Sequence, residues 1–483
     1  MSRSNSYPGL LRWTLALVLL SALSCTTDYV TGKRTFSLVS ESQEIQMGKE
    51  SDGSIVAEYG AYDDPALSQY VSNIGQKIAR TSQRSSLIYT FRVLDSPVVN
   101  AFALPGGYVY ITRGILAHFN SEDELAGVVG HEVGHVVARH SAEQISRAQV
   151  ASLGLSLGVM LSEDFSRFAD AAGIGVQLLF LKFSRDQESE SDLLGVEYST
   201  KLGYDARRMA GFFKTLKAMS AESGQGLPTF LSTHPDPGNR EVRVNTLAGE
   251  WQGKVAYQPL NINPEDYLSR IDGIVYGDDP RQGFVENDTF FHPAFGFQFP
   301  VPSGWQLQNT ASSVTAVSAD ETGAMQLTLG KGTGAAAAAD EFVSSSGAVV
   351  SQRKSRTVHG FPCVTVASSV KSDTDELRVL SYFIEKDSKV FVMHGFASAA
   401  KYDSHAGDFS RVMEGFNKVT DQSVLNRQPQ HLRIKKARAA GTMRSALQAL
   451  GTESGALQEM AVLNGKTLDD RVAAGALIKT VGK

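Results

Sequence analysis

The sequence predicts an α+β multidomain protein: a mainly helical domain with a small sheet over residues 25–258, an α/β sandwich over 284–420 and a small βααβ module over 431–483. The length of 483 residues fits this division, because domains average roughly 100–200 residues. Apolar residues recur with helical spacing through most of the first region. The composition then shifts to strand-rich, aromatic runs, and a polar linker at 421–430 precedes the last module.

The elements of the first region can be predicted in order. Residues 41–85 have helical apolar faces, and 89–94 alternate as a strand does. Two further strand-like runs, 100–104 and 108–112, flank Pro105-Gly106-Gly107 and therefore predict a hairpin. Ser121 followed by Glu124 is a capping-box start for a helix that we expect to reach about His140. Helical stretches follow at about 163–202 and 205–222, and then a loop at 223–240.

The N-terminus predicts a secretion signal over residues 1–24. Arg3 and Arg12 are basic, and the apolar run that follows is shorter than the roughly 20 residues that span a bilayer. The run ends in Ala22-Leu23-Ser24-Cys25, which resembles a bacterial lipobox and predicts lipidation of Cys25. Ordinary signal cleavage and an uncleaved anchor are the alternatives.

Composition and cysteine content narrow the class of protein. With 42% hydrophobic and 20% charged residues and a net charge of −5, no charge extreme indicates a nucleic-acid partner. Two cysteines exclude a disulfide framework, and Cys363 is expected in a core. The apolar runs 151–161 and 173–183 have about 11 residues each, so they predict buried helices rather than membrane spans.

The segment His131-Glu132-Val133-Gly134-His135 lies within the helix predicted over 121–140. Residues four apart share a helix face, so the two imidazoles can supply the first two ligands of a zinc ion. Glu132 can reach a metal-bound water, take its proton and pass it to a leaving amine. Such a pattern arises by chance in about one chain in a hundred. The alternative is a helix with two partly buried histidines and no metal.

A catalytic zinc needs a third protein ligand and one open position. Glu188, in Ser184-Arg-Asp-Gln-Glu188-Ser-Glu-Ser-Asp192, is the candidate. Asp192 follows one turn later and can accept a hydrogen bond from a zinc-binding histidine, which fixes that ring's tautomer. Glu190 is the rival ligand, although it would point away from Asp192. An acidic, solvated helix face is the alternative without a metal.

The loop Ser232-Thr-His234-Pro-Asp-Pro-Gly-Asn-Arg240 offers two more candidates. We expect His234 either to stabilise the oxyanion of a reaction intermediate or to be a fourth ligand that closes the site. A surface histidine is the alternative. Arg240 would hold Glu188 or the loop in place, or be a surface charge.

The hairpin and the end of the motif helix supply the remaining candidate site residues. A peptidase holds an extended substrate beside the metal, and an edge strand does this by strand addition. We therefore expect Asn100, Ala101, Phe102 and Ala103 to bind substrate, with an ordinary core hairpin as the alternative. His140 is five residues beyond His135 and off the metal face of a continuous helix, so we expect it to make a structural hydrogen bond.

Four segments occur in order and together resemble peptidase family forty-eight of the metallopeptidases, which includes HtpX-like and CAAX prenyl endopeptidases. They are Asn100-Ala-Phe-Ala-Leu-Pro-Gly-Gly107, His131–His135 with Ala138-Arg-His140, Ser184–Asp192 and Ser232-Thr-His-Pro235. The resemblance covers about residues 29–250, and Tyr29-Val-Thr-Gly-Lys-Arg34 resembles the lipoprotein members.

This resemblance implies a zincin-like (gluzincin) domain with one zinc ion bound by His131, His135 and Glu188. Glu132 would be the general base and acid, Asp192 would support a ligand from behind, and His234 would cap the zinc and keep the site latent. Within the family the chain is similar to the exported, BepA-like branch. That similarity implies a periplasmic endopeptidase, lipid-anchored to the outer membrane, that acts on misfolded or misassembled envelope proteins.

The regions after residue 258 modify this expectation. BepA-like proteins carry a helical repeat domain, and no 34-residue repeat is visible here. The segment from His292 to Trp305 resembles PsbP-like α/β domains, and residues 431–483 resemble a divergent LysM module with Ala440-Gly441-Thr442 at its start. LysM modules typically bind peptidoglycan, so a glycan partner or a structural role is expected. A chaperone-like or cell-wall-tethered binding protein with a latent metal site is the alternative function.

Overall fold

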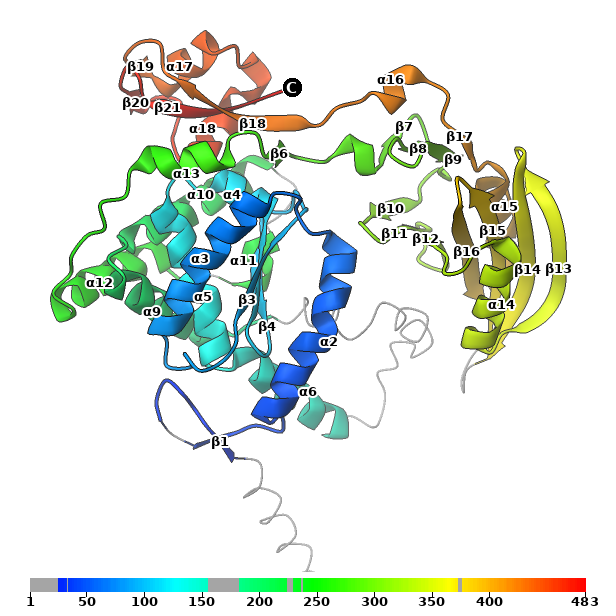
Figure 1. The fold of residues 1–483 in the computed structure, drawn as a ribbon, viewed down its shortest axis with the longest axis horizontal. Coiled ribbons are helices and arrows are strands. Elements are labelled where there is room, and N and C mark those ends of the chain that lie inside the picture. The colour runs from blue at the N-terminus through cyan, green and yellow to red at the C-terminus, as the bar shows by residue number, and fades with distance from the viewer. Residues whose placement is uncertain (1–24, 33, 155–181, 224–228, 236–237, 372–375) are drawn as a thin grey trace, which may run out of the picture.

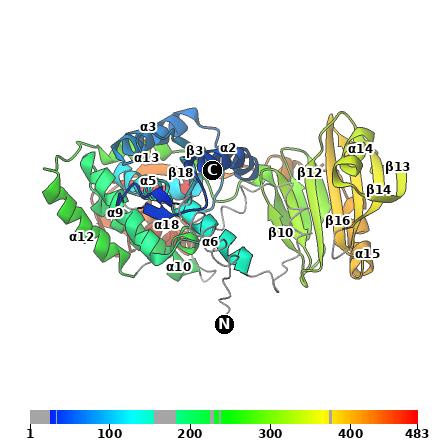
Figure 2. The same ribbon diagram turned by 90° about the horizontal axis from the view of Figure 1, so that it is seen from below.

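A computed structural model describes residues 25–32, 34–154, 182–223, 229–235, 238–371 and 376–483. The predicted signal at 1–24 and most of the apolar runs 151–161 and 173–183 lie outside these residues. Two bodies lie side by side: a mainly helical body, which includes the C-terminal module, and a β-rich body (Figures 1 and 2). Within the described part of the chain, no helix has the length and apolar character to cross a membrane.

The helical body is built around one long central helix and a small sheet. Its elements are β1 (Cys25–Thr27), β2 (Arg34–Phe36), α2 (Glu41–Tyr59), α3 (Pro65–Thr81), β3 (Thr90–Leu94), β4 (Ala101–Leu104), β5 (Tyr108–Thr112), α4 (Arg113–His118), α5 (Glu122–Val137), α6 (His140–Gly154), α9 (Arg185–Lys201), α10 (Arg207–Ser223), α11 (Thr229–Thr233), α12 (Arg240–Lys254), α13 (Pro264–Ile271) and β6 (Val275–Tyr276).

The small sheet has the strand order β3-β5-β4. β5 pairs parallel to β3 and antiparallel to β4, so the hairpin predicted around Pro105-Gly106-Gly107 is confirmed. Both glycines adopt positive φ, which a residue with a side chain rarely does. β4, which begins at Ala101, is left as an edge strand of this sheet.

The central helix α5 starts where the sequence predicts, because the Ser121 hydroxyl accepts the Glu124 N–H. The expected extension to His140 is wrong. α5 ends at Val137, Arg139 has a φ of 58°, and His140 opens the next helix, α6. A left-handed residue ends a helix because its positive φ turns the following chain out of the helical path. The Arg139 N–H itself bonds to the Val136 oxygen at 3.2 Å.

α9 packs closely against α5 along a line of small residues. A Cβ on Gly195 would lie 2.8 Å from the His131 nitrogen, and one on Gly134 would lie 3.2 Å from the Cα of Ser191. The absent side chains let the two backbones approach, and this approach brings Glu188 of α9 beside the histidines of α5.

The β-rich body has a seven-stranded antiparallel sheet of order β10-β11-β12-β16-β15-β14-β13 and a four-stranded sheet of order β17-β9-β8-β7. Its elements are η2 (Pro280–Gln282), β7 (Phe284–Glu286), β8 (Thr289–His292), β9 (Phe297–Pro300), β10 (Gln306–Asn309), β11 (Ser313–Val317), β12 (Gly323–Leu329), α14 (Ala335–Ser346), β13 (Val349–Val358), β14 (Phe361–Lys371), β15 (Glu376–Lys386), β16 (Lys389–Ser398), α15 (Tyr402–Glu414), β17 (Asn417–Lys418) and α16 (Gln422–Leu425).

Both faces of the large sheet are covered, as an α/β sandwich requires. On β15, Phe383 packs with α14, while the adjacent Tyr382 and Ile384 pack with α15 and the smaller sheet. Cys363 is buried in the second of these clusters, as expected, and burial raises the pKa of its thiol to about 11. The likeness to PsbP-like domains stays a prediction.

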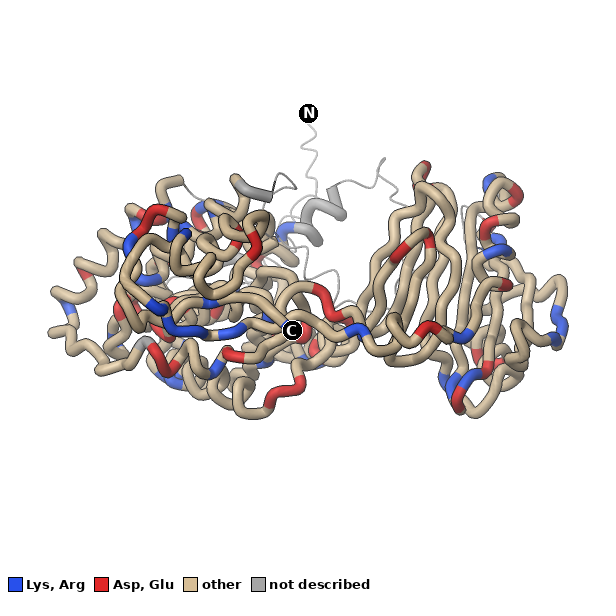
Figure 3. Tube along the Cα trace, turned by 90° about the horizontal axis from the view of Figure 1, so that it is seen from above, with Lys and Arg blue, Asp and Glu red and all other residues tan. Residues whose placement is uncertain are grey.

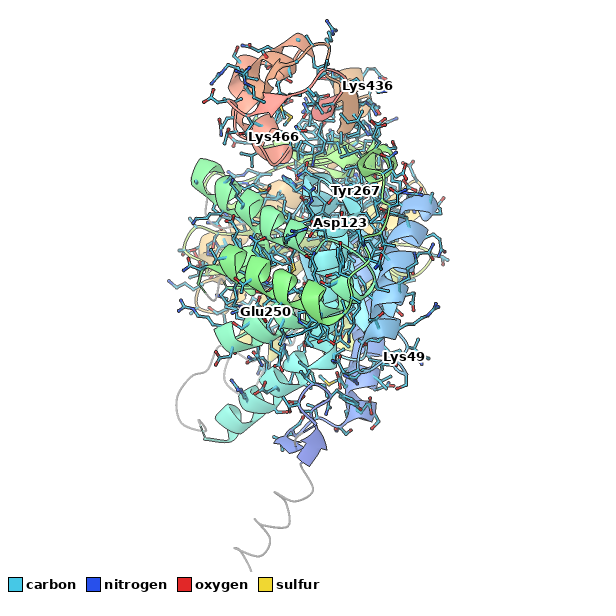
Figure 4. All side chains as sticks on the ribbon, turned by 90° about the vertical axis from the view of Figure 1, so that its left-hand side faces the viewer. Lys49, Asp123, Glu250, Tyr267, Lys436 and Lys466 are labelled. Atoms are coloured by element: carbon cyan, nitrogen blue, oxygen red, sulfur yellow. The ribbon has the colours of Figure 1, made fainter. Side chains whose placement is uncertain are left out.

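The C-terminal module has the predicted order of strand, helix, helix, strand. Its elements are β18 (Gln430–Lys436), β19 (Gly441–Thr442), α17 (Met443–Ala449), η3 (Ser454–Ala456), α18 (Leu457–Leu463), β20 (Arg471–Val472) and β21 (Leu477–Gly482). β18 pairs with β21 on one side and with β6 of the helical body on the other. Lys436 and Lys466 lie on this module, next to the part of the helical body that carries Tyr267 and Asp123 (Figure 4).

Candidate metal centre

Three segments bring four potential metal ligands together in the helical body. α5 supplies His131 and His135, α9 supplies Glu188, and the residue directly after α11 is His234. One ligand atom from each lies within 4.8 Å of the others, and all four side chains are buried. Among the residues that the structure describes, this is the one such group.

The ligand atoms converge on a single point. The two Nε2 atoms of His131 and His135 are 3.0 Å apart. The Glu188 carboxylate lies 3.4 Å from the first of these nitrogens and 3.3 Å from the second. His234 Nδ1 is 3.0 Å from Glu188 Oε1 and 3.3 Å from His131 Nε2. Unprotonated ring nitrogens and a carboxylate repel one another at such distances, unless a proton or a metal ion lies between them.

Asp192 and Arg240 support this group from behind. Asp192 Oδ1 is 3.0 Å from His131 Nδ1, so a proton on Nδ1 leaves the Nε2 lone pair directed at the other ligands. Arg240 donates to both Asp192 oxygens, at 2.9 and 2.7 Å, and lies 3.2 Å from Glu188 Oε2. Arg240 is buried, so the expectation of a surface charge is wrong and that of a residue holding Glu188 matches its contacts.

The electrostatics of the group favour a cation. Although burial opposes it, electrostatic interactions with His234 and His131 and hydrogen bonds from His131 and His135 hold the pKa of Glu188 well below its usual value. Burial and Arg240 lower the pKa of His131, but hydrogen bonds to Asp192 and Glu188 outweigh them and raise it to about 9. Burial lowers the pKa of His135 well below its usual value. The low pKa of Glu188 keeps a carboxylate anion among the ring nitrogens, and such an anion attracts a cation.

Glu132 is the strongest sign that the group has a function. Its carboxyl is fully buried, and neither oxygen has a hydrogen-bond partner. Burial raises its pKa, while His234 and His131 oppose the rise. A buried polar group without a partner costs roughly 1–3 kcal/mol, so it is retained where a water or a substrate completes it. Two histidines, one carboxylate and this orphaned acid fit a catalytic zinc site.

The position of His234 excludes one of the three alternatives left open for it. The ring is completely buried, so the surface alternative is wrong. It stacks on Phe230 of α11 with ring centroids 4.6 Å apart, and its Nδ1 lies among the ligand atoms. Its Nε2 is 3.8 Å from Glu132 Oε1. This placement is compatible with a fourth metal ligand, and the oxyanion role also stays a prediction.

Glu190 and His140 lie near the motif but outside the group of potential metal ligands. Glu190 points away from the ligand group and contacts His140 Nε2 at 3.2 Å. His140 is buried, and its Nδ1 lies 3.0 Å from Nδ1 of His135. Sequence reasoning missed this contact because it continued one helix through residue 140; the φ of Arg139 that breaks the helix has no signature in the sequence.

The proposed substrate strand lies beside the group and is partly covered. The side chains of Ala101, Phe102 and Ala103 are buried in two hydrophobic clusters. Asn100 is also buried, and its Oδ1 has no hydrogen-bond partner. Just before this strand, the Val99 oxygen accepts the N–H of Phe230 at 3.2 Å. The segment that positions His234 is thus bonded to the chain that leads into the edge strand.

Comparisons with known proteins address the same region. The family described as Peptidase family M48 matches residues 65–248. The mitochondrial metalloendopeptidase OMA1 of Schizosaccharomyces pombe is 33% identical over 233 residues, which cover 47% of this chain and 67% of that protein. A putative beta-barrel assembly-enhancing protease of Vibrio cholerae is 31% identical over 214 residues, which cover 42% of this chain and 43% of that protein.

Among solved structures, cyanobacterial PsbP from Synechocystis sp. PCC 6803 aligns with 28% of this chain and 91% of its own. The TM-score is 0.23 at 16% identity. The chain thus spans two thirds of the yeast relative's length and less than half of the Vibrio relative's length.

Proposed function

Because the chain belongs to peptidase family M48, we propose that it is a zinc-dependent endopeptidase of the bacterial envelope that hydrolyses misfolded or misassembled exported proteins. The observation that carries the proposal is the buried group of His131, His135 and Glu188, with the unpartnered carboxyl of Glu132 beside it. A gluzincin-type domain with one zinc ion per chain is part of this proposal.

Each side chain of the group would have its own role in hydrolysis. His131, His135 and Glu188 would hold the zinc, which when bound activates a water and polarises the scissile carbonyl. Glu132 takes the proton of the attacking water and delivers it to the leaving nitrogen. Its burial suits this task, because burial raises the pKa of its carboxyl and so lets it carry a proton between the two steps. Asp192 keeps the His131 ring in the required tautomer.

Substrate would bind as an added strand. β4 is an edge strand beside the ligand group, so an extended peptide can pair with the backbone of residues 100–103. The unpartnered Asn100 Oδ1 is available to accept a hydrogen bond from such a peptide.

His234 would keep the resting enzyme latent. With zinc bound, His234 would take the position that a catalytic zinc leaves open for water. α11 is bonded through Phe230 to the chain that leads into β4. Displacement of α11 would free the fourth position and the start of the strand edge together. His234 would then be placed to stabilise the oxyanion.

The proposed location and partners are supported by the two terminal segments and by the name of one relative. Residues 1–24 with Cys25 support export and lipid anchoring at the outer membrane. The name of the Vibrio relative supports substrates among misassembled β-barrel proteins. Peptidoglycan would be a further partner through the LysM-like residues 431–483. The closed site favours one second candidate, a chaperone-like binding protein that keeps a latent metal site.

Cleavage of casein by zinc-loaded protein separates these functions. We expect His234→Ala to cleave faster than the wild type, chelator to abolish cleavage, and Glu132→Gln to be inactive while retaining zinc. If the His234→Ala variant holds zinc but shows no chelator-sensitive cleavage, the endopeptidase proposal fails. A Glu132→Gln variant that still complements the function in cells would favour the binding protein.

A further inference from the structure

His140 is a buried, chemically active residue that the mechanism above does not use. On a continuous helix it would lie about 140° around the axis from His135, at 3.6 residues per turn. The helix break at Arg139 changes this geometry. With Arg139 in the left-handed region, His140 opens α6, and its ring turns back toward α5.

The break is held in place by buried charges. Arg139 Nε donates to Glu44 Oε2 at 2.8 Å, and Arg139 Nη2 donates to the Val39 oxygen at 2.8 Å. Glu44 also accepts from the buried Arg84 at 3.1 Å. A left-handed conformation is sterically unfavourable for a residue with a Cβ. Such strained residues persist where the surrounding contacts hold them, and they cluster at functional sites.

The contacts of His140 indicate what the left-handed conformation of Arg139 makes possible. Its Nδ1 lies 3.0 Å from His135 Nδ1, with the two ring centroids 5.0 Å apart and the planes at 73°. Its Nε2 lies 3.2 Å from Glu190 Oε2. The Ser191 hydroxyl lies 3.3 Å from the same Nδ1.

One arrangement of protons satisfies these contacts while His135 binds a metal. His135 must offer the lone pair of Nε2, so its proton is on Nδ1 and is donated to His140 Nδ1. His140 then carries its proton on Nε2 and donates it to the Glu190 carboxylate. No other neutral arrangement uses all three groups.

We propose that His140 is a positioning residue that fixes the tautomer and the ring orientation of the zinc ligand His135, and that Glu190 orients His140. The inference rests on the proposed zinc site and deepens it. Both zinc-binding histidines are then supported by carboxylates of α9: His131 directly by Asp192, and His135 by Glu190 through His140. Glu190, the rival ligand in the sequence, is thus separated from the metal by two residues, His140 and His135.

The test measures zinc affinity of the full chain by competition with a chromophoric chelator, rather than cleavage. His140→Leu removes the acceptor, and we expect zinc affinity to fall about 10–100-fold, as is common when the partner of a metal-binding histidine is lost. His140→Gln keeps an acceptor oxygen and should recover most of the affinity. Nitrogen-15 NMR of the histidines should show zinc-bound His135 protonated at Nδ1 in the wild type and in His140→Gln.

Two matched controls separate positioning from packing. His118→Leu removes another buried histidine, one that donates to the Gly114 oxygen in α4, and Glu143→Gln changes a carboxylate on the same helix as His140. Neither should alter zinc affinity. Glu190→Leu, at a position about one-third exposed, should weaken zinc binding less than His140→Leu, and it carries the test if His140→Leu does not fold.

Wild-type zinc affinity in both His140→Leu and Glu190→Leu would overturn the inference. So would a His140→Gln variant that is folded by circular dichroism yet binds zinc as weakly as His140→Leu. A wild-type chain that binds no zinc would instead contradict the proposed function, so the two failures can be told apart.

Discussion

The β-rich body and the C-terminal module both follow the peptidase region in the sequence, but they relate to it in opposite ways. The β-rich body has hydrophobic clusters of its own, built from residues 290–416. The buried residues of the C-terminal module, among them Leu432, Leu447 and Ile478, instead belong to the same cluster as the core of α5 and α10. A segment at the end of a chain can therefore be part of the first domain's core.

The register of the strands explains how this is possible. Gln430 of β18 is paired with Tyr276 of β6, so the β-rich body is inserted between two neighbouring strands of one sheet. Its hydrogen bonds to the helical body include Ala311 N–H to the Glu58 oxygen at 3.0 Å and Gln282 to Asp95 at 2.7 Å. Such polar contacts resemble those of transient interfaces.

The module, by contrast, is anchored by a buried lysine. Lys479 Nζ donates to the backbone oxygens of Ala117 and Phe119, at 2.9 and 3.0 Å, where α4 ends. The nearby Glu124 lies in the first turn of the motif helix. Acidic and basic positions are interspersed along both bodies (Figure 3). Lys479 differs from a surface lysine because it is buried between the module and the helical body.

The largest difference between the C-terminal module and the β-rich body is expected when each is deleted. Removal of 431–483 should leave the helical body unable to fold, because it exposes the shared core and removes the partner of β6. Replacement of 279–427 by a short Gly/Ser linker should leave zinc binding intact, because the ends at 276 and 430 are paired and a hairpin loop of about 2–5 residues joins such strands. Soluble yield and zinc content check both. A deletion of 431–483 that binds zinc normally would contradict the shared core.

Core truncations give the next largest effect. Leu447→Ala in the module and Phe391→Ala in the β-rich body each remove a fully buried side chain, at about 3–5 kcal/mol. We expect the first to lower the temperature at which zinc is released and the second to leave it unchanged. Calorimetry with a fluorescent zinc indicator measures this. Equal effects of both variants on zinc release would mean that the two bodies unfold as one unit.

A smaller effect is expected at the anchoring lysine. Lys479→Met leaves two backbone oxygens without a donor, which costs about 2–4 kcal/mol. Lys466→Met, at an exposed position of the same module, should change the free energy of unfolding by less than about 0.5 kcal/mol. Urea unfolding of the three proteins gives the values. Identical midpoints for wild type and Lys479→Met would show that the module is held without this contact.

The smallest effect is a pH dependence of the same contact. Burial, partly opposed by the charge of Glu124, lowers the pKa of Lys479 to about 7. Above this pH the unfolded chain binds a proton that the folded chain lacks, up to the unfolded pKa of about 10.4, so the free energy of unfolding rises with pH. Relative to Lys479→Met, the wild type should gain at most about 1.4 kcal/mol between pH 8 and pH 9. A difference that stays constant over this pH range would show that the folded lysine remains charged.

The limits of sequence reasoning follow the same division between local and distant contacts. His131, His135 and the start of α5 could be predicted, because helical spacing and a capping serine are local patterns. The contacts of Lys479 could not be predicted, because the alternation of a strand indicates which side chains point inward but not which carbonyls they meet. A structural hydrogen bond was expected for His140, but its contact with His135 was missed for a related reason. The residue that turns the chain, Arg139, is held in place by Glu44, 95 positions earlier.

The zinc content of the purified protein is the decisive measurement for the ligand assignment. We expect one zinc per chain in the wild type, loss of zinc in Glu188→Ala, and retention in Glu190→Ala at saturating zinc. A Glu188→Ala variant that holds one zinc as firmly as the wild type would contradict the assignment of Glu188 as the third ligand, and with it the site on which the proposed peptidase depends.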